Sequence, residues 1–203
     1  MTPAQIKNDL DAIADIDPDI KTGLEIVGYP APRIRAPGFE TFLSIIIGQQ
    51  ISTEAAAAVM RRVRERLPCI EATELLALSS EALRAAGLSG RKVEYAKGLA
   101  QAIVDGTFDL DRLVDMDDER AIKTITGLRG FGDWSAEIYL MFCLQRRDIF
   151  PANDLALQVA LQKLKRLEQR PTALQSRALV AKWEPWRSAG SLFLWHYYRG
   201  APG

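Results

Sequence analysis

The chain has 203 residues and 48% of them are hydrophobic, so it is long enough to bury a sizeable core in one domain or in two small helical lobes. Lys and Arg together number 26, as do Asp and Glu, so the formal net charge is zero. This balance argues against a protein that nucleic acid attracts by bulk charge. It leaves room for a local basic face, or for contacts made by backbone N–H groups.

Apolar residues recur with helical spacing along the chain, and no convincing alternation of period two occurs. Thr2-Pro3 and Asp17-Pro18 are good helix starts, and prolines and glycines make residues 28–38 a loop. Ser52 is expected to cap a helix and Gly87 to end one. These signals predict an all-α fold, with helices over about residues 3–16, 18–28, 39–48, 52–67, 72–78, 80–86, 91–106, 117–127, 134–145 and 154–168, and two more that begin near residues 171 and 184.

The cysteines and the first residues bear on the compartment. Cys69 and Cys143 each lie in an apolar helical context, so we expect buried free thiols, which suits a reducing compartment. Two cysteines are too few to hold zinc or an iron–sulfur cluster through four thiolates. Residues 1–17 lack the apolar core of a signal peptide, and no run reaches transmembrane length. A cytoplasmic protein without a membrane partner is therefore expected.

The helix over residues 52–67 is expected to turn Ala55–Ala58 inward and to carry a basic cluster. A second basic cluster lies near the end of the helix over 154–168. Both clusters are interpreted as solvated helix faces, with phosphate contact as the alternative. The residues concerned are Arg61, Arg62, Arg64 and Arg66 in the first cluster, Lys163, Lys165 and Arg166 in the second, and Arg33, Arg35 and Arg187 as weaker candidates elsewhere.

Residues 126–136 join two predicted helices through Gly130-Phe131-Gly132. The simplest interpretation is an αα-hairpin whose glycines allow positive φ. The alternative is a phosphate site, because small residues let the backbone approach closely and the following helix presents free N–H groups and a positive dipole. Such a site binds nucleic acid without net positive charge, in keeping with the composition.

Asp154 follows Pro151-Ala152-Asn153, which is a helix-entry signal. The simplest interpretation is a helix N-cap. The dipole and the free N–H groups of the helix would also stabilise the carboxylate in its ionised form. A fixed negative charge of this kind can also stabilise positive charge that develops in a transition state and orient an attacking water.

Several segments together resemble a known family. Leu128–Ala136 resembles the hairpin of the helix–hairpin–helix DNA glycosylases. More narrowly, the chain is similar to the single-domain form of the DNA-3-methyladenine glycosylase II group. Further segments match that group in chain order, and they are residues 39–52, 83–99, 150–155 and 183–188.

The resemblance implies that Asp154 is the catalytic residue. Trp134 stands where relatives with lyase activity carry the lysine that forms a Schiff base, which implies the monofunctional branch. Trp134 and Trp195 match aromatic positions of the pocket for the flipped base, where an electron-rich ring suits a cationic alkylated base. Core packing is the alternative for Trp195. Ile138 stands where relatives often offer an aromatic ring, so Tyr139 or another residue is expected to compensate.

Either Gln50 or Ile51 is expected to fill the gap that the flipped base leaves in the duplex, although Gln49 and Gln50 also fit a polar interruption that caps a helix. DNA contacts are expected from Gln49, Gln50, Ile51, Arg129, Gly130, Phe131, Gly132 and Ser135. No cofactor is expected to be required. The resemblance implies a structural Na⁺ or K⁺ at the backbone carbonyls of Thr126, Leu128 and Phe131.

The sequence thus predicts one helix–hairpin–helix glycosylase domain over residues 1–203, with the active site in a cleft between two lobes. About 1–35 and 150–203 form one lobe, about 36–145 the other, and 126–136 the hairpin. A monomer, associated with the bacterial nucleoid when on DNA, would remove 3-methyladenine-like purines from duplex DNA during base excision repair. The alternatives are a glycosylase for another damaged base, a non-catalytic DNA-binding module with the same hairpin, and a helical scaffold for protein partners.

Overall fold

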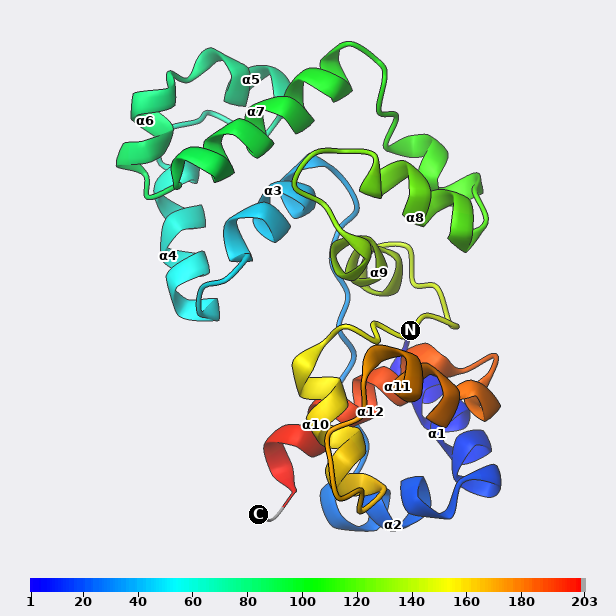
Figure 1. Cartoon of the computed structure of the whole chain (residues 1–203). Helices are drawn as coiled ribbons and strands as arrows, with labels where there is room; N and C mark the ends of the chain where they lie inside the picture. The colour runs from blue at the N-terminus through cyan, green and yellow to red at the C-terminus, as the bar shows by residue number, and fades with distance from the viewer. Residues whose placement is uncertain (202–203) are drawn as a thin grey trace. The chain divides into compact units, whose positions relative to one another are not determined.

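The computed structural model describes residues 1–201, which form helices and no β-strand (Figure 1). The expected all-α fold is confirmed. Residues 202–203 of the predicted lobe over 150–203 lie outside the described residues. Within residues 1–201, no helix is both long enough and apolar enough to cross a membrane. The helices are α1 Pro3–Ile16, α2 Pro18–Val27, α3 Phe39–Gly48, α4 Thr53–Arg64, α5 Ala72–Ala77, α6 Ser80–Ala85, α7 Gly90–Val104, η1 Asp111–Asp115, α8 Asp118–Thr126, α9 Asp133–Phe142, α10 Leu155–Leu164, α11 Ala173–Leu179, η2 Ala181–Trp183 and α12 Arg187–Gly200, where η marks a 3₁₀-helix.

Most helices begin at the polar residue that the sequence indicates. Thr2 forms a capping box at α1: its hydroxyl accepts the N–H of Gln5 at 3.2 Å, and the Gln5 side chain accepts the N–H of Thr2 at 2.8 Å. The side chains of Ser52, Ser89 and Asp154 cap α4, α7 and α10 by accepting a backbone N–H of the first turn. The predicted N-cap at Asp154 is therefore confirmed.

Three helices, α4, α9 and α10, end three or four residues earlier than predicted, and the others with a predicted end stop within about two residues of the prediction. α4 stops before residue 67 because Pro68 disfavours helical backbone at the residue that precedes it. α9 and α10 each stop shortly before a left-handed residue, Gln145 at φ 57° and Arg166 at φ 54°. A left-handed residue turns the chain out of the helix, as glycine does at many helix ends.

Two predictions about burial are wrong. Cys69 is exposed, because the helix has already ended and the residue lies in the connection to α5. Ala55 and Ala57 are also exposed, on the first turns of α4, whereas Cys143 is buried as predicted. The buried residues of α4 are Val59, Met60 and Val63. Only the second half of this helix therefore contributes to the core.

The chain divides into two compact units. Unit 1 combines Met1–Ile34 with the chain from Leu140 onward, and unit 2 comprises Arg35–Tyr139. In unit 1, α10 packs against α12, and α1 packs against α2 and α12. Its largest fully buried side chains are Ile6, Leu10, Ile13, Ile20, Trp183 and Phe193.

In unit 2, the apolar helix α3 packs against α4 and α7, and α5 packs against α7. Phe42 on α3 is the hub of an aromatic cluster: its ring centroid lies 5.4 Å from those of Phe108 and Phe131, and it stacks on Tyr139 at 4.1 Å. Phe131 belongs to the α8–α9 connection and Tyr139 to α9. Hydrophobic burial on α3 therefore positions both the connection and the helix that follows it.

Candidate functional site

The turn between α8 and α9 lies in unit 2, and its conformation requires glycine. Gly130 has φ 96°, and a Cβ at this position would lie only 2.4 Å from Cγ of Tyr95. The Phe131 N–H donates to the Leu128 carbonyl at 3.1 Å, and the Phe131 ring is buried against Phe42. The predicted positive φ is confirmed at Gly130 and not at Gly132. Two independent constraints require glycine at position 130: its backbone conformation and the closeness of Tyr95.

The predicted contact residues of this hairpin differ in what they present. Gly132 and Arg129 are exposed, and the Arg129 guanidinium forms an ion pair with Glu94 on α7. Phe131 is only 6% exposed and Ser135 only 4%. Phe131 is therefore a core anchor of the turn, and the surface that the hairpin offers is mainly backbone.

The loop that follows α3 is fastened on two sides. Gln49 Nε2 donates to the Gly130 carbonyl at 2.8 Å, so the loop is attached directly to the hairpin. Lys92 Nζ donates to the Ile47 carbonyl at 2.8 Å, at the C-terminal end of α3, where a positive charge complements the helix dipole. Burial lowers the pKa of the Lys92 ammonium. The tips of the loop, Gln50 at φ 58° and Ile51, remain exposed.

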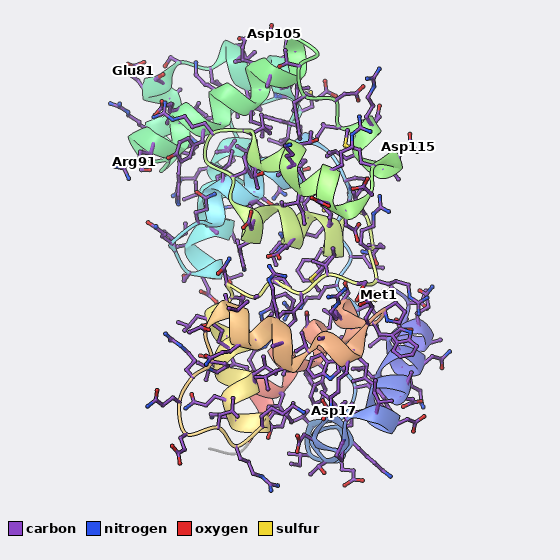
Figure 2. All side chains as sticks on the ribbon, turned by 45° about the vertical axis from the view of Figure 1, so that its right-hand side comes forward. Met1, Asp17, Glu81, Arg91, Asp105 and Asp115 are labelled. Atoms are coloured by element: carbon purple, nitrogen blue, oxygen red, sulfur yellow. The ribbon has the colours of Figure 1, made fainter. Side chains whose placement is uncertain are left out.

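The loop after α3, the hairpin and the first turns of α7 and α9 together enclose a hollow of about 460 Å³ in unit 2. Its lining residues are Gly48, Gln49, Gln50, Ser89, Arg91, Lys92, Tyr95, Gly130, Gly132, Trp134 and Ser135. Arg91 lies at the N-terminal end of α7, opposite the end that carries Asp105 (Figure 2). The first turns of α7 and α9 both contribute to the lining, so the positive ends of two helix dipoles and the side chains of Arg91 and Lys92 lie at one hollow.

The second group of predicted residues lies in unit 1. Asp154 Oδ1 accepts the N–H of Leu157 at 3.1 Å and the indole N–H of Trp195 at 3.2 Å. Trp195 is 9% exposed on α12 and lies beside Phe142, with 5.7 Å between the ring centroids. The structure thus brings Asp154 and Trp195 together, and both donors direct positive dipoles at the half-buried carboxylate.

The other two aromatic residues of the predicted base pocket have different surroundings. Trp134 is 38% exposed and lines the hollow in unit 2. Tyr139 is fully buried, its ring stacked on Phe42 and its hydroxyl accepting the N–H of Gly38 at 3.3 Å. Through these contacts, Tyr139 packs against α3 and the residue that precedes it. They do not support the prediction that Tyr139 lines the base pocket.

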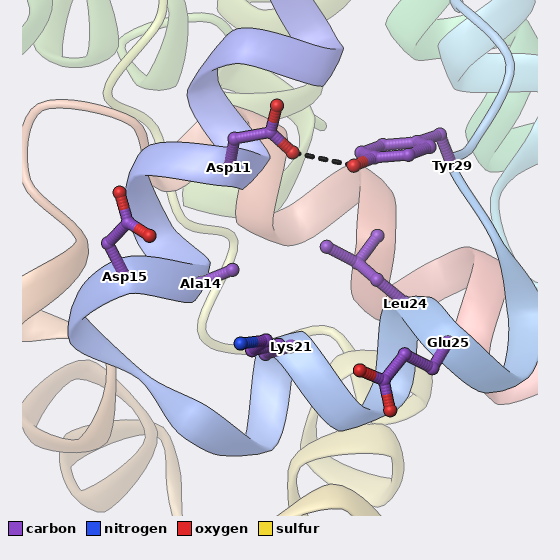
Figure 3. A pocket seen from close by; sticks show the side chains of 7 residues that line it. All are labelled: Asp11, Ala14, Asp15, Lys21, Leu24, Glu25 and Tyr29. Carbon is purple, nitrogen blue, oxygen red and sulfur yellow. Dashed lines mark hydrogen bonds between the residues drawn. The ribbon is translucent and has the colours of Figure 1, made fainter.

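A further hollow of about 340 Å³ lies between α1 and α2 in unit 1 (Figure 3). Asp11, Asp15 and Glu25 line it together with Lys21, and the hydroxyl of Tyr29 donates to Asp11 Oδ1 at 2.6 Å. Hydrogen bonds from Lys7 and Tyr29 lower the pKa of the Asp11 carboxyl. The excess of carboxylates repels a phosphate backbone, so this face is unsuited to DNA.

The hairpin and Asp154 both lie within a stretch of the chain that matches a known family. A model of the family described as "HhH-GPD superfamily base excision DNA repair protein" matches residues 43–185. The chain belongs to this superfamily.

Relatives by sequence support the assignment. DNA-3-methyladenine glycosylase 1 of Schizosaccharomyces pombe is 27% identical over 192 residues, covering 90% of this chain and 83% of that protein. DNA-3-methyladenine glycosylase 2 of Escherichia coli is 30% identical over 196 residues, covering 89% of this chain and 66% of that protein. Both names describe enzymes of one kind.

Solved structures agree. The S. pombe 3-methyladenine DNA glycosylase in complex with abasic DNA matches with a TM-score of 0.86 and 26% identity, over 93% of this chain and 95% of that chain. DNA-3-methyladenine glycosidase of Bacillus halodurans matches with a TM-score of 0.82 and 27% identity, over 94% and 89%. The helix–hairpin–helix glycosylase fold that the sequence predicts is therefore confirmed.

Three residues of these sites were missed in the sequence. Lys92 and Tyr95 belong to a segment that the resemblance covers, but their contacts with the loop after α3 and with Gly130 depend on how α7 packs. Arg33 was considered only for phosphate contact, whereas its guanidinium lies over the Trp195 ring, 5.6 Å from the centroid. None of these contacts has a local sequence signal.

Proposed function

We propose that this protein is a monofunctional DNA glycosylase that hydrolyses the N-glycosidic bond of alkylated purines, 3-methyladenine-like lesions above all, in duplex DNA. The observation that carries the proposal is the carboxylate of Asp154, fixed by the first turn of α10 and by the indole N–H of Trp195. The superfamily and the names of the relatives support the same reaction.

The proposed chemistry needs one fixed negative charge. As the glycosidic bond breaks, positive charge develops on the sugar, and the ionised Asp154 stabilises it and orients the attacking water. Alkylation at N3 or N7 makes the purine a cation, which weakens the bond and favours stacking on electron-rich rings such as those of Trp134 and Trp195.

The hairpin is proposed to hold the DNA backbone. Gly132 exposes its backbone beside the N-terminus of α9, where free N–H groups bind a phosphate without a charged side chain. Gln50 or Ile51, both exposed on a loop that Gln49 and Lys92 fasten, would fill the gap left by the flipped base. Backbone carbonyls at the C-terminal end of α8 suit a structural Na⁺ or K⁺, because the negative end of the helix dipole lies there. The carbonyls concerned are those of Thr126, Leu128 and Phe131, of which Leu128 also accepts the Phe131 N–H.

Treatment of the protein with methylated duplex DNA and sodium borohydride is expected to yield no covalent complex. A Schiff base requires an amine beside the sugar, and Trp134 has none to offer. The measurement is a denaturing gel of labelled DNA, with a glycosylase/lyase of the same superfamily as the positive control. A heat-stable protein–DNA band formed by the wild-type protein would show lyase activity and refute the monofunctional assignment.

Substitution of the two hairpin glycines by alanine is expected to separate folding from DNA contact. Gly130→Ala should destabilise the protein by about 1–3 kcal/mol, because its Cβ collides with Tyr95 and its φ disfavours any side chain. Gly132→Ala should fold normally, since no atom beyond its two chain neighbours lies within 4 Å of the added Cβ. Its affinity for duplex DNA should nevertheless fall, because the methyl group lies where a phosphate would approach.

Thermal unfolding and duplex binding by fluorescence anisotropy measure the two effects. Wild-type affinity in Gly132→Ala would remove the hairpin from the DNA-binding surface, and wild-type stability in Gly130→Ala would contradict the turn geometry.

A further inference from the structure

Trp195 has two charged partners in unit 1. Its indole N–H donates to Asp154 Oδ1 at 3.2 Å, and the Arg33 guanidinium carbon lies 5.6 Å from its ring centroid. An N–H that donates to a carboxylate leaves more electron density on the ring, which strengthens its attraction for a cation. The Trp195 ring is therefore a favourable site for a cation, and in this structure the Arg33 guanidinium occupies it.

Arg33 is kept over the ring by little else. Its side chain is exposed, so solvent surrounds much of the guanidinium. The backbone is better fixed, because Pro30 and Pro32 precede it in the wall of a hollow of about 490 Å³ that Arg199 and His196 also line. A fixed backbone with a loosely held guanidinium lets the charge leave the ring without disturbing the fold.

The same ring is the proposed wall for the damaged base, so the guanidinium and the base compete. We propose that Arg33 is a specificity-determining residue whose positive charge on Trp195 disfavours cationic alkylated bases relative to neutral damaged bases. A cationic purine that stacks on the indole meets a like charge, whereas a neutral base of similar size does not. The inference rests on the proposed function, because it takes Trp195 as a wall of the base pocket.

The experiment compares two lesions in the same duplex, 7-methylguanine as the cationic base and hypoxanthine as the neutral one. Single-turnover release of each base gives the ratio of their second-order rate constants, and any general effect on DNA affinity cancels in this ratio. Arg33→Gln should raise the ratio of cationic to neutral release about two- to fivefold, the range set by a cation–π contact at an exposed site. Arg33→Lys keeps the charge and should leave the ratio within about twofold of the wild-type value.

Arg199→Gln is the matched control. Arg199 lines the same hollow and carries the same charge, but its Nε donates to the backbone carbonyl of Trp195. This variant should leave the ratio unchanged, because the contact with the ring is intact. An unchanged or lowered ratio in Arg33→Gln, or an equal rise in Arg199→Gln, would overturn the proposed role of Arg33. Release of neither base by the wild-type protein would instead refute the proposed glycosylase activity.

Discussion

Replacement of Asp154 by asparagine is expected to reduce base release from methylated duplex DNA by about 10²–10³-fold or more, the loss seen when one fixed stabilising group is removed from a transition state. The fold should survive, because asparagine caps helices about as well as aspartate does and can still accept the Leu157 N–H. Affinity for DNA should also survive, since the proposed grip lies at the hairpin. The measurement is chromatography of released bases under single-turnover conditions, with anisotropy for binding.

Asp117→Asn provides a control that makes the same chemical change at another helix cap. Asp117 caps α8 by accepting the N–H of Arg120 at 2.8 Å, as Asp154 caps α10. Because its carboxylate has no proposed role in catalysis, this variant should release bases at the wild-type rate. Full activity in Asp154→Asn would refute the mechanism. If the wild-type protein bound duplex DNA equally well but released no base, the non-catalytic DNA-binding module would be favoured.

The helix starts were predictable because their cause is local. Ser52 and Asp154 each accept an N–H of the next turn, and such a contact involves residues three positions apart in the sequence. The hairpin was predictable for a similar reason, since a turn that needs positive φ favours glycine at that one position of the sequence. These local signals, together with the resemblance of several segments, were sufficient for the fold.

Burial was less predictable because it depends on partners distant in the sequence. Helical spacing alone placed Ala55–Ala58 inside, yet Ala55 and Ala57 remain exposed on the first turns of α4 in the described part of the chain. Tyr139 is an aromatic residue of the kind that lines a base pocket. Its ring, however, stacks on Phe42, and its hydroxyl accepts the N–H of Gly38, both about a hundred positions earlier. The contact between Arg33 and Trp195 joins the two ends of the chain, so no window of sequence contains it.

Replacement of Asp17 by asparagine is expected to cost about 3–5 kcal/mol of folding free energy at neutral pH, the loss typical of a broken buried ion pair. Asp17 is fully buried, and its two oxygens accept from Lys165 Nζ at 2.5 and 2.6 Å and from the indole N–H of Trp183 at 2.8 Å. Asparagine can retain the cap of α2, so the loss reports the charge. Asp19→Asn is the control: Asp19 contacts the same ammonium at 2.9 Å but is 41% exposed, so about 1 kcal/mol or less is expected.

The same pair of variants gives a pH dependence with a defined sign. Burial by itself raises the pKa of the Asp17 carboxyl, but hydrogen bonds from Lys165 and Trp183 with the charges of Lys165 and Lys182 outweigh it and lower the pKa below its ordinary value of 3.8. A lowered pKa in the folded state means that the ionised group stabilises the fold above 3.8 and that this contribution fades as the pH falls below it. Urea unfolding of wild type and Asp17→Asn should therefore show a constant gap near neutral pH that narrows in acid. A gap that stays constant down to the acid limit, or an Asp17→Asn loss no greater than that of Asp19→Asn, would show that the buried carboxylate is not what holds α10 against the start of α2.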